Sequence, residues 1–255
     1  MDWLETFGLL AAAFAGGTVN AVTGGGTLIA FPALVAAGYP ARTANVTNTA
    51  ALWTGYLGGA IGYRRELSDQ RTRIARLLAP ALLGAMAGAA LLLGTPEDAF
   101  EVIAPFLILF ATLLLAFQRR LSAFAASHQL AAEDGDHVPL MLYVSIFLSA
   151  VYGAYFGAGL GILTFAFLTI FAPGDAQQSN ALKVFLSLVV NGLALACFAL
   201  FGPVQWGPAG VMAGGPLAGG YLGAGVARRL GAERLRLAVI ALGVVMAVVL
   251  FVRAV

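Results

Sequence analysis

The sequence predicts an all-α integral membrane protein with about 8–10 transmembrane segments in two inverted-topology repeats, each with a short broken half-helix. Composition is the first observation: 60% of the 255 residues are hydrophobic and only 10% are charged, whereas soluble domains carry about 25% charged residues. The second is a set of apolar runs, such as 99–117 and 237–252, that match a helix crossing roughly 30 Å of hydrocarbon. The third is an internal duplication of the sequence.

The charged and reactive residues exclude several classes of protein. The net charge is only +2 and the arginines fall in short loops between apolar segments, so no nucleic-acid partner is predicted. Cys197 is the single cysteine, which excludes an internal disulfide, and it is interpreted as a small buried apolar residue. His128 and His137 fall in a hydrophilic stretch, so no metal site and no cofactor are predicted. Asp2 and Glu5 stand where a signal peptide needs positive charge, which indicates a retained first helix.

Ten apolar segments follow one another along the chain, and the only long hydrophilic stretch separates them near the middle. We therefore expect a first membrane repeat over residues 1–117, a linker over 118–137 and a second membrane repeat over 138–255. The predicted segments are 4–22, 27–37, 44–63, 74–93, 99–117, 138–156, 162–172, 180–201, 206–227 and 235–254.

The two halves repeat each other at a constant spacing of 135 residues. This shift places Gly24 on Gly159 and, without a gap, Asn45 on Asn180. Internal duplication is the usual construction of secondary transporters. The other matching pairs are Gly26 with Gly161, Leu28 with Leu163, Gly84 with Gly219, Gly88 with Gly223, and Ala89 with Ala224.

The placement of arginine predicts that the two repeats have opposite orientations. Cytoplasmic loops carry an excess of Lys and Arg. In the first half the basic loop follows the third segment (residues 64–76), whereas in the second half it follows the ninth (residues 228–236). Corresponding loops therefore face opposite sides of the membrane. With Arg119 and Arg120 at its start, the central linker is expected to be cytoplasmic and both termini external.

Two segments are too short to cross the membrane. Residues 27–37 and 162–172 have eleven residues each, and such a helix spans only roughly 17 Å. Their N-terminal ends leave N–H groups without helical partners and carry partial positive charge, which favours anions. Glycine at such an end lets a ligand approach the backbone closely. The residues predicted to bind an anion here are Gly24, Gly25, Gly26, Thr27, Gly159 and Gly161.

A polar cluster precedes the long segment that follows each short one. Thr43, Asn45, Thr47 and Asn48 are predicted to cap the start of segment three, and Gln177, Gln178, Ser179 and Asn180 the start of segment eight. If so, four helix N-termini would converge near the midplane, ringed by amide and hydroxyl groups. Such a cage suits a small oxyanion.

Two cations and several buried polar residues extend this candidate site. Lys183 is the only lysine and precedes an apolar run. An ionisable group inside a membrane segment is a functional hypothesis by default, the alternative being a side chain that reaches the membrane surface. Arg42 fits a site or a surface loop equally well. Asn191, like Asn20, Thr23 and Thr164, is a candidate cavity residue or a hydrogen-bonding contact between helices. The glycine-rich steps at 84–90 and 214–225 indicate close helix packing.

Both halves resemble a known family. GGGTLIAFPALVAAGYPARTANVTNTAA, residues 24–51, resembles the first signature of the sulfite exporter TauE/SafE family. GAYFGAGLGILTF and SNALKVFLSLVVNG look like its second signature, including Lys183 and the downstream Asn191. The resemblance implies a bacterial-type inner-membrane permease for sulfite, sulfonates or other small organosulfur anions. Two departures leave the substrate open: Leu160 stands where the first copy has Gly25, and Ser179–Leu182 replaces the family's usual Ala-Thr-Ser before the lysine.

The sequence therefore favours a secondary transporter that exports a small sulfur-containing oxyanion across the lipid bilayer. A sodium- or cation-coupled carrier is one alternative, because the carbonyl ends of the short helices are potential cation ligands. An intramembrane lipid-phosphate enzyme is a weaker alternative, because its chemistry needs a general acid or base and the predicted spans contain no His and no clear carboxylate. The oligomeric state stays open, with a homodimer as one option.

Overall fold

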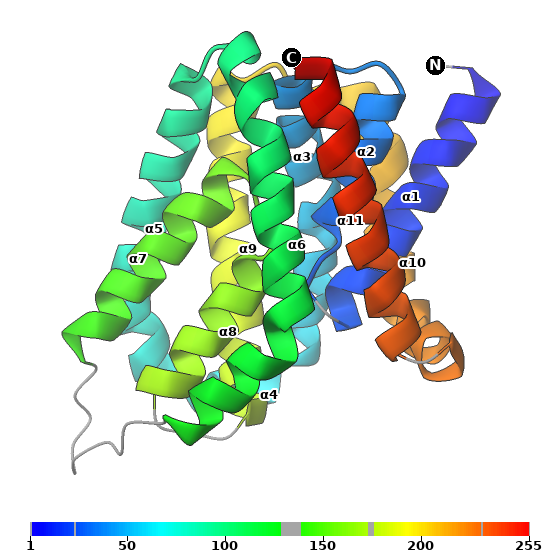
Figure 1. The fold of residues 1–255 in the computed structure, drawn as a ribbon. Helices are drawn as coiled ribbons and strands as arrows, with labels where there is room; N and C mark the ends of the chain where they lie inside the picture. The colour runs from blue at the N-terminus through cyan, green and yellow to red at the C-terminus, as the bar shows by residue number, and fades with distance from the viewer. Residues whose placement is uncertain (1, 23, 129–138, 173–175, 231, 255) are drawn as a thin grey trace.

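The protein is all-helical. The computed structural model describes residues 2–22, 24–128, 139–172, 176–230 and 232–254, and this part of the chain contains eleven helices and no strands (Figure 1). The predicted fold class is confirmed. The helices are α1 (Trp3–Val22), α2 (Thr27–Ala36), α3 (Ala41–Gly62), α4 (Arg64–Ser68), α5 (Arg71–Gly94), α6 (Glu97–Ser127), α7 (Leu140–Tyr155), α8 (Leu160–Phe171), α9 (Ala176–Phe201), α10 (Trp206–Leu230) and α11 (Ala232–Ala254).

Several helices are suited to a bilayer. Within the described ranges, four stretches are long and apolar enough to cross a membrane: Arg71–Gly94, Glu97–Ser127, Gln177–Phe201 and Glu233–Val252. Three further apolar helices, α2, α7 and α8, are shorter. α3 has 22 residues but is less apolar than these, since its first two turns are rich in Thr and Asn. Many large apolar side chains on the outer surface are exposed, as lipid-facing residues would be. The chain is thus a multi-pass membrane protein.

Each predicted apolar segment corresponds to a helix, and several boundaries differ by a few residues or more. α6 ends at Ser127 rather than at residue 117, because Leu121 and Ala125 continue its buried face. α3 begins at Ala41 rather than at residue 44, directly after Pro40. α9 begins at Ala176 rather than at residue 180. Of the predicted linker, 129–137 lies outside the described residues, and so do Thr23 and His137.

Several helices begin at positions that are 135 residues apart. α3 and α9 start at Ala41 and Ala176, and α5 and α10 start at Arg71 and Trp206. α1 packs on α10 as its counterpart α7 packs on α5. In Figure 1, α1 starts at the end of the bundle that holds both termini, whereas α7 starts at the opposite end. α1 and α7 therefore run in opposite directions.

The first short helix turns back rather than crossing the bundle. α2 has ten residues and begins beside the second half of α1, where a Cβ added to Gly26 would overlap the Gly16 carbonyl oxygen. After α2 the Tyr39 hydroxyl donates to Glu5 Oε1 at 2.9 Å, near the start of α1. α1 and α2 thus form a re-entrant hairpin whose tip lies inside the protein.

Glycine lets pairs of long helices pack so closely that their backbones are in contact. Cβ atoms added to Gly84 and Gly88 of α5 would overlap the carbonyl oxygens of Phe147 and Val151 on α7. An added Cβ on Gly219 of α10 would overlap the Phe14 carbonyl oxygen of α1 in the same way. At these three positions the predicted role of the glycine steps in close packing is confirmed.

Candidate functional site

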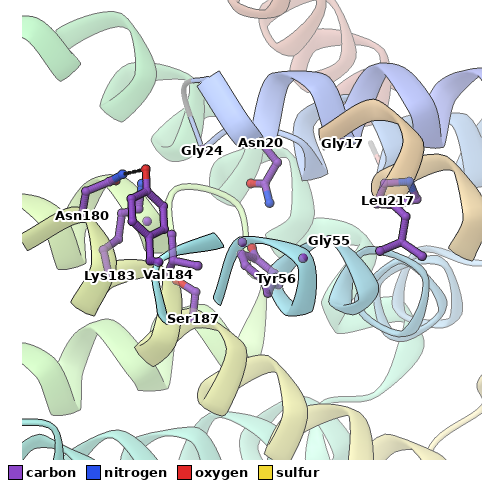
Figure 2. Close-up of a pocket in the computed structure, with 15 residues that line it drawn as sticks. Gly17, Asn20, Gly24, Gly55, Tyr56, Asn180, Lys183, Val184, Ser187 and Leu217 are labelled. Carbon is purple, nitrogen blue, oxygen red and sulfur yellow. Dashed lines mark hydrogen bonds between the residues drawn. The ribbon is translucent and has the colours of Figure 1, made fainter. Parts of the chain in front are cut away.

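A cavity of about 320 Å³ lies between α1, α3, α9, α10 and the start of α8. Figure 2 shows Asn180 and Lys183 at one end of this cavity, with Asn20 and Tyr56 facing it from α1 and α3. We call it the lysine pocket. It is lined by Gly17, Asn20, Gly24, Gly55, Tyr56, Gly58, Gly59, Tyr63, Gly161, Asn180, Lys183, Val184, Ser187, Pro216 and Leu217.

Lys183 supplies the positive charge of this pocket. Its position is the second turn of α9, and its Cδ would lie 3.6 Å from a Cβ added to Gly161. Its ammonium nitrogen is 6.0 Å from the ring centroid of Phe165. Throughout the described ranges, no carboxylate forms an ion pair with Lys183. An uncompensated charge inside a membrane protein is expensive, so this ammonium group is available to an anionic ligand.

The breaks that precede the two short helices meet inside the protein. A Cβ added to Gly24 would lie 3.9 Å from Ile162 Cγ1, so the break before α2 contacts the first turn of α8. On the other side, a Cβ added to Gly157 would lie 3.8 Å from Thr27 Oγ1, in the first turn of α2. Gly24 has φ +81° and Gly159, the N-cap of α8, has φ +85°, a region that other residues rarely adopt. The structure therefore brings the N-termini of α2 and α8 together.

Asn180 is held at one end of the pocket by a tyrosine. Its Nδ2 donates to the Tyr63 hydroxyl at 2.6 Å, the hydrogen bond drawn in Figure 2. Sequence reasoning did not identify Tyr63, Tyr56 or Ser187. A signal existed for two of them: Ser187 follows Lys183 by one helical turn, and Tyr56 stands 135 residues before Asn191.

The polar residues of α3 do not cap the helix, which corrects the sequence prediction. The N-cap is Pro40 and makes no side-chain cap hydrogen bond, so Thr43, Asn45, Thr47 and Asn48 all lie within the helix. Their partners belong to distant segments. Asn45 Nδ2 donates to the Tyr155 carbonyl oxygen at 2.8 Å, and Thr47 Oγ1 accepts from the Gln205 backbone N–H at 3.1 Å. Because α9 begins at Ala176, Gln177, Gln178, Ser179 and Asn180 lie within that helix too, not at its cap.

Arg42 belongs to a partly buried ion pair. Its Nε lies 3.5 Å from Glu97 Oε2, its backbone N–H donates to Glu97 Oε1 at 2.6 Å, and its Nη1 donates to the Thr95 carbonyl oxygen at 2.8 Å. The start of α3 therefore lies at the end of the bundle, next to the acidic first turn of α6. The expected convergence of four helix N-termini is wrong for α3; the starts of α2 and α8 are the pair that meets.

The predicted site residues separate into three groups. Gly24, Gly161, Asn180 and Lys183 line the lysine pocket. Thr27, Asn45, Asn48 and Asn191 lie around the break between α7 and α8, since Asn48 Nδ2 is 3.4 Å from Thr27 Oγ1 and a Cβ added to Gly157 would lie 3.9 Å from Asn191 Oδ1. Gly159 belongs to the break itself, as the N-cap of α8, and the residues that line neither are Gly25, Gly26, Thr47, Ser179 and Arg42.

Comparisons with known proteins agree with this architecture. A "Probable membrane transporter protein" of Haemophilus influenzae is 28% identical over 199 residues, covering 78% of this chain and 75% of the relative. The "Probable membrane transporter protein YfcA" of Escherichia coli K12 is 28% identical over 212 residues, covering 80% and 74%. The ORF9 transporter protein of a Sinorhizobium species is 26% identical over 200 residues, covering 78% and 74%. No solved structure matches the chain significantly.

The family model described as "Sulfite exporter TauE/SafE" matches residues 9–250. This range contains both short helices, both helix breaks and every residue that lines the lysine pocket. The match and the names of the relatives indicate a membrane transporter rather than an enzyme. The chain belongs to the TauE/SafE sulfite exporter family.

Proposed function

We propose that the protein is a secondary transporter that exports a small sulfur-containing oxyanion, such as sulfite or an organosulfonate. The observation that carries this proposal is Lys183, whose ammonium group has no carboxylate partner in the described chain and lines an internal pocket. The family description supports the sulfur chemistry.

The remaining lining of the lysine pocket suits an oxyanion. Asn20, Asn180 and Ser187 carry side chains that donate hydrogen bonds. Gly24 and Gly161 present bare backbone near the starts of α2 and α8, where helix N–H groups favour negative charge. A volume of about 320 Å³ is at the lower limit of common ligand pockets. Each of these features supports a small, multiply hydrogen-bonded anion as the substrate.

Charge distribution supports loading from the cytoplasm. α4, the end of α6, the end of α10 and the start of α11, which all carry arginines, lie at the end of the bundle opposite the termini (Figure 1). By the positive-inside rule this end faces the cytoplasm of an inner membrane. Tyr63, which lines the lysine pocket, directly precedes α4. Because the cell interior is electrically negative, the membrane potential would drive an anion that binds there outward. This driving force is about 2.3 kcal/mol per charge per 100 mV.

The two halves support a symmetric gating movement. Opposite directions of equivalent helices and helix starts 135 residues apart are what inverted repeats produce. We propose that 1–117 and 138–255 act as these repeats and rock against each other around the helix breaks. In this arrangement the substrate stays near the centre while access changes sides.

Efflux from proteoliposomes tests the proposed function. Purified protein is reconstituted in vesicles loaded with sulfite, thiosulfate, taurine or sulfoacetate, and efflux is followed after a defined potential is imposed. We expect at least one of these solutes to leave faster than from protein-free vesicles, at a rate that increases when the loaded side is negative. Efflux of all of them at the protein-free rate would contradict the proposal.

Removing the Tyr63 hydroxyl provides a finer test of the pocket. In Tyr63→Phe, Asn180 loses the acceptor that holds its amide. A hydrogen bond contributes about 0.5–1.5 kcal/mol net, so we expect the apparent KM for the transported anion to rise roughly two- to tenfold. Tyr143→Phe, on α7 and outside the pocket, is the matched control. Equal KM values for both variants and the wild type would show that Tyr63 does not contribute to anion binding.

A further inference from the structure

We propose a second site in this protein, for a monovalent cation, with sodium as the ion. It lies where α3 faces the break between α7 and α8, and its ligands are oxygens of Asn45, Asn48, Thr27 and Asn191. None of these four residues lines the lysine pocket.

Asn45 presents a buried oxygen with a fixed direction. Its side chain is 1% exposed, and its Nδ2 donates to the Tyr155 carbonyl oxygen at 2.8 Å. Because the amide nitrogen must face that carbonyl, Oδ1 is the opposite, free end of the group. No donor of the described chain reaches Asn45 Oδ1.

Asn48 presents a second such oxygen one helical turn further along α3. Its side chain is 2% exposed, and Oδ1 has no donor among the described residues. Leaving a buried acceptor unsatisfied costs about 1–3 kcal/mol. Two neighbouring amide oxygens in this state indicate a positively charged or hydrogen-donating ligand between α3 and the break.

Two further oxygens point toward the same region. Asn191 Nδ2 donates to the Ser187 carbonyl oxygen at 2.9 Å, which leaves Oδ1 as its free end. Asn191 Oδ1 and Thr27 Oγ1 would lie 3.9 and 3.8 Å from a Cβ added to Gly157. Because Gly157 has no side chain, both oxygens face the space beside the break.

The chemistry of the cluster selects a monovalent cation. All four side-chain groups are neutral oxygen ligands, and α7 ends at Tyr155, so the partial negative charge of its C-terminus also favours a cation. Calcium and magnesium sites use carboxylates. No Asp or Glu occurs among the four residues, and no group of three or more acidic, His or Cys residues occurs anywhere in the described ranges.

The internal duplication gives an independent reason. Position 48 plus 135 is position 183, so Asn48 is the counterpart of Lys183. One half thus carries a fixed ammonium group where the other presents unsatisfied amide oxygens. A bound sodium ion would place positive charge at the equivalent position of the first half. That this ion is coupled to anion movement rests on the proposed function; its binding does not.

Equilibrium binding of ²²Na⁺ to the purified full-length protein tests the site without any substrate. Measured in choline chloride, the wild type should bind sodium saturably, with displacement by unlabelled NaCl and little by KCl or MgCl2. Asn48→Ala should lose saturable binding, whereas Asn48→Asp should bind sodium more tightly because a carboxylate replaces the amide. Ser149→Ala removes another buried, unpartnered oxygen, outside the cluster, and should bind like the wild type.

Several results would overturn the site. These are absence of saturable sodium binding to folded wild type, unchanged binding in both Asn48 variants, or displacement by potassium as effective as by sodium. Circular dichroism and gel filtration establish that each variant is folded; if Asn48→Ala is not, the gain of affinity in Asn48→Asp decides. Sodium binding without anion efflux would contradict the proposed function and leave this site standing. Anion efflux without sodium binding would contradict this site and leave the proposed function standing.

Discussion

Lys183→Ala should abolish high-affinity anion transport without weakening the fold. Removing one member of a buried charged contact costs about 2–5 kcal/mol, which corresponds to a loss of affinity of roughly 30-fold or more. Efflux from proteoliposomes gives the change in KM. The unliganded variant should melt no lower than the wild type, because it no longer holds an uncompensated charge inside the protein. Stabilisation by the substrate in a thermal-shift experiment should disappear.

Two companion variants separate charge from packing at this position. Lys183→Arg keeps the positive charge and should retain part of the transport. Cys197→Ala, on the same helix but outside the lysine pocket, should transport like the wild type. Equal KM values for Lys183→Ala and Cys197→Ala would show that the ammonium group does not hold the anion.

Gly26→Val should have the largest effect on stability. The first added carbon would overlap the Gly16 carbonyl oxygen and lie 2.9 Å from Asn20 Cβ, so the backbones of α1 and α2 would have to separate. Overpacking of a core typically costs 1–3 kcal/mol, and here backbone has to move, so we expect a loss at the upper end of this range. Thermal unfolding in detergent should show a Tm lower by about 6–12 °C, since 1 kcal/mol corresponds to roughly 2–4 °C at this chain length.

Gly8→Val is the matched control on the same helix hairpin. A Cβ at Gly8 has no neighbour within 4 Å, and the position is exposed. Its Tm should stay close to that of the wild type. A Gly26→Val protein as stable as Gly8→Val would mean that α2 does not pack against α1 as described.

Hydrophobicity predicted the membrane fold well because each apolar segment is long relative to its loops. All ten predicted segments correspond to helices, and Lys183 was singled out because a lone cation in an apolar run is conspicuous in any sequence. The short length of residues 27–37 and 162–172 correctly indicated half-helices. These features depend on local composition, which a sequence displays directly.

Long-range contacts explain what the sequence did not reveal. Thr and Asn near a helix start resemble caps, but Asn45 and Thr47 bond to residues 110 and 158 positions away. Arg42 fitted two roles until its ion pair with Glu97 was seen. Tyr63 stands at the end of a membrane helix, where tyrosine commonly marks the lipid headgroup region, and only its hydrogen bond to Asn180 connects it with the pocket.

The 135-residue relation assigns each wall of the lysine pocket a counterpart in the other half. Gly59 and Tyr63 correspond to Ala194 and Phe198, both of which are 0% exposed and packed in the hydrophobic core. At these two positions the second half therefore packs apolar side chains together, without the hydroxyl that Tyr63 contributes to the lysine pocket. Because these two side chains carry no charge, ionic strength should affect their packing little, while cooling should loosen it as hydrophobic interactions weaken.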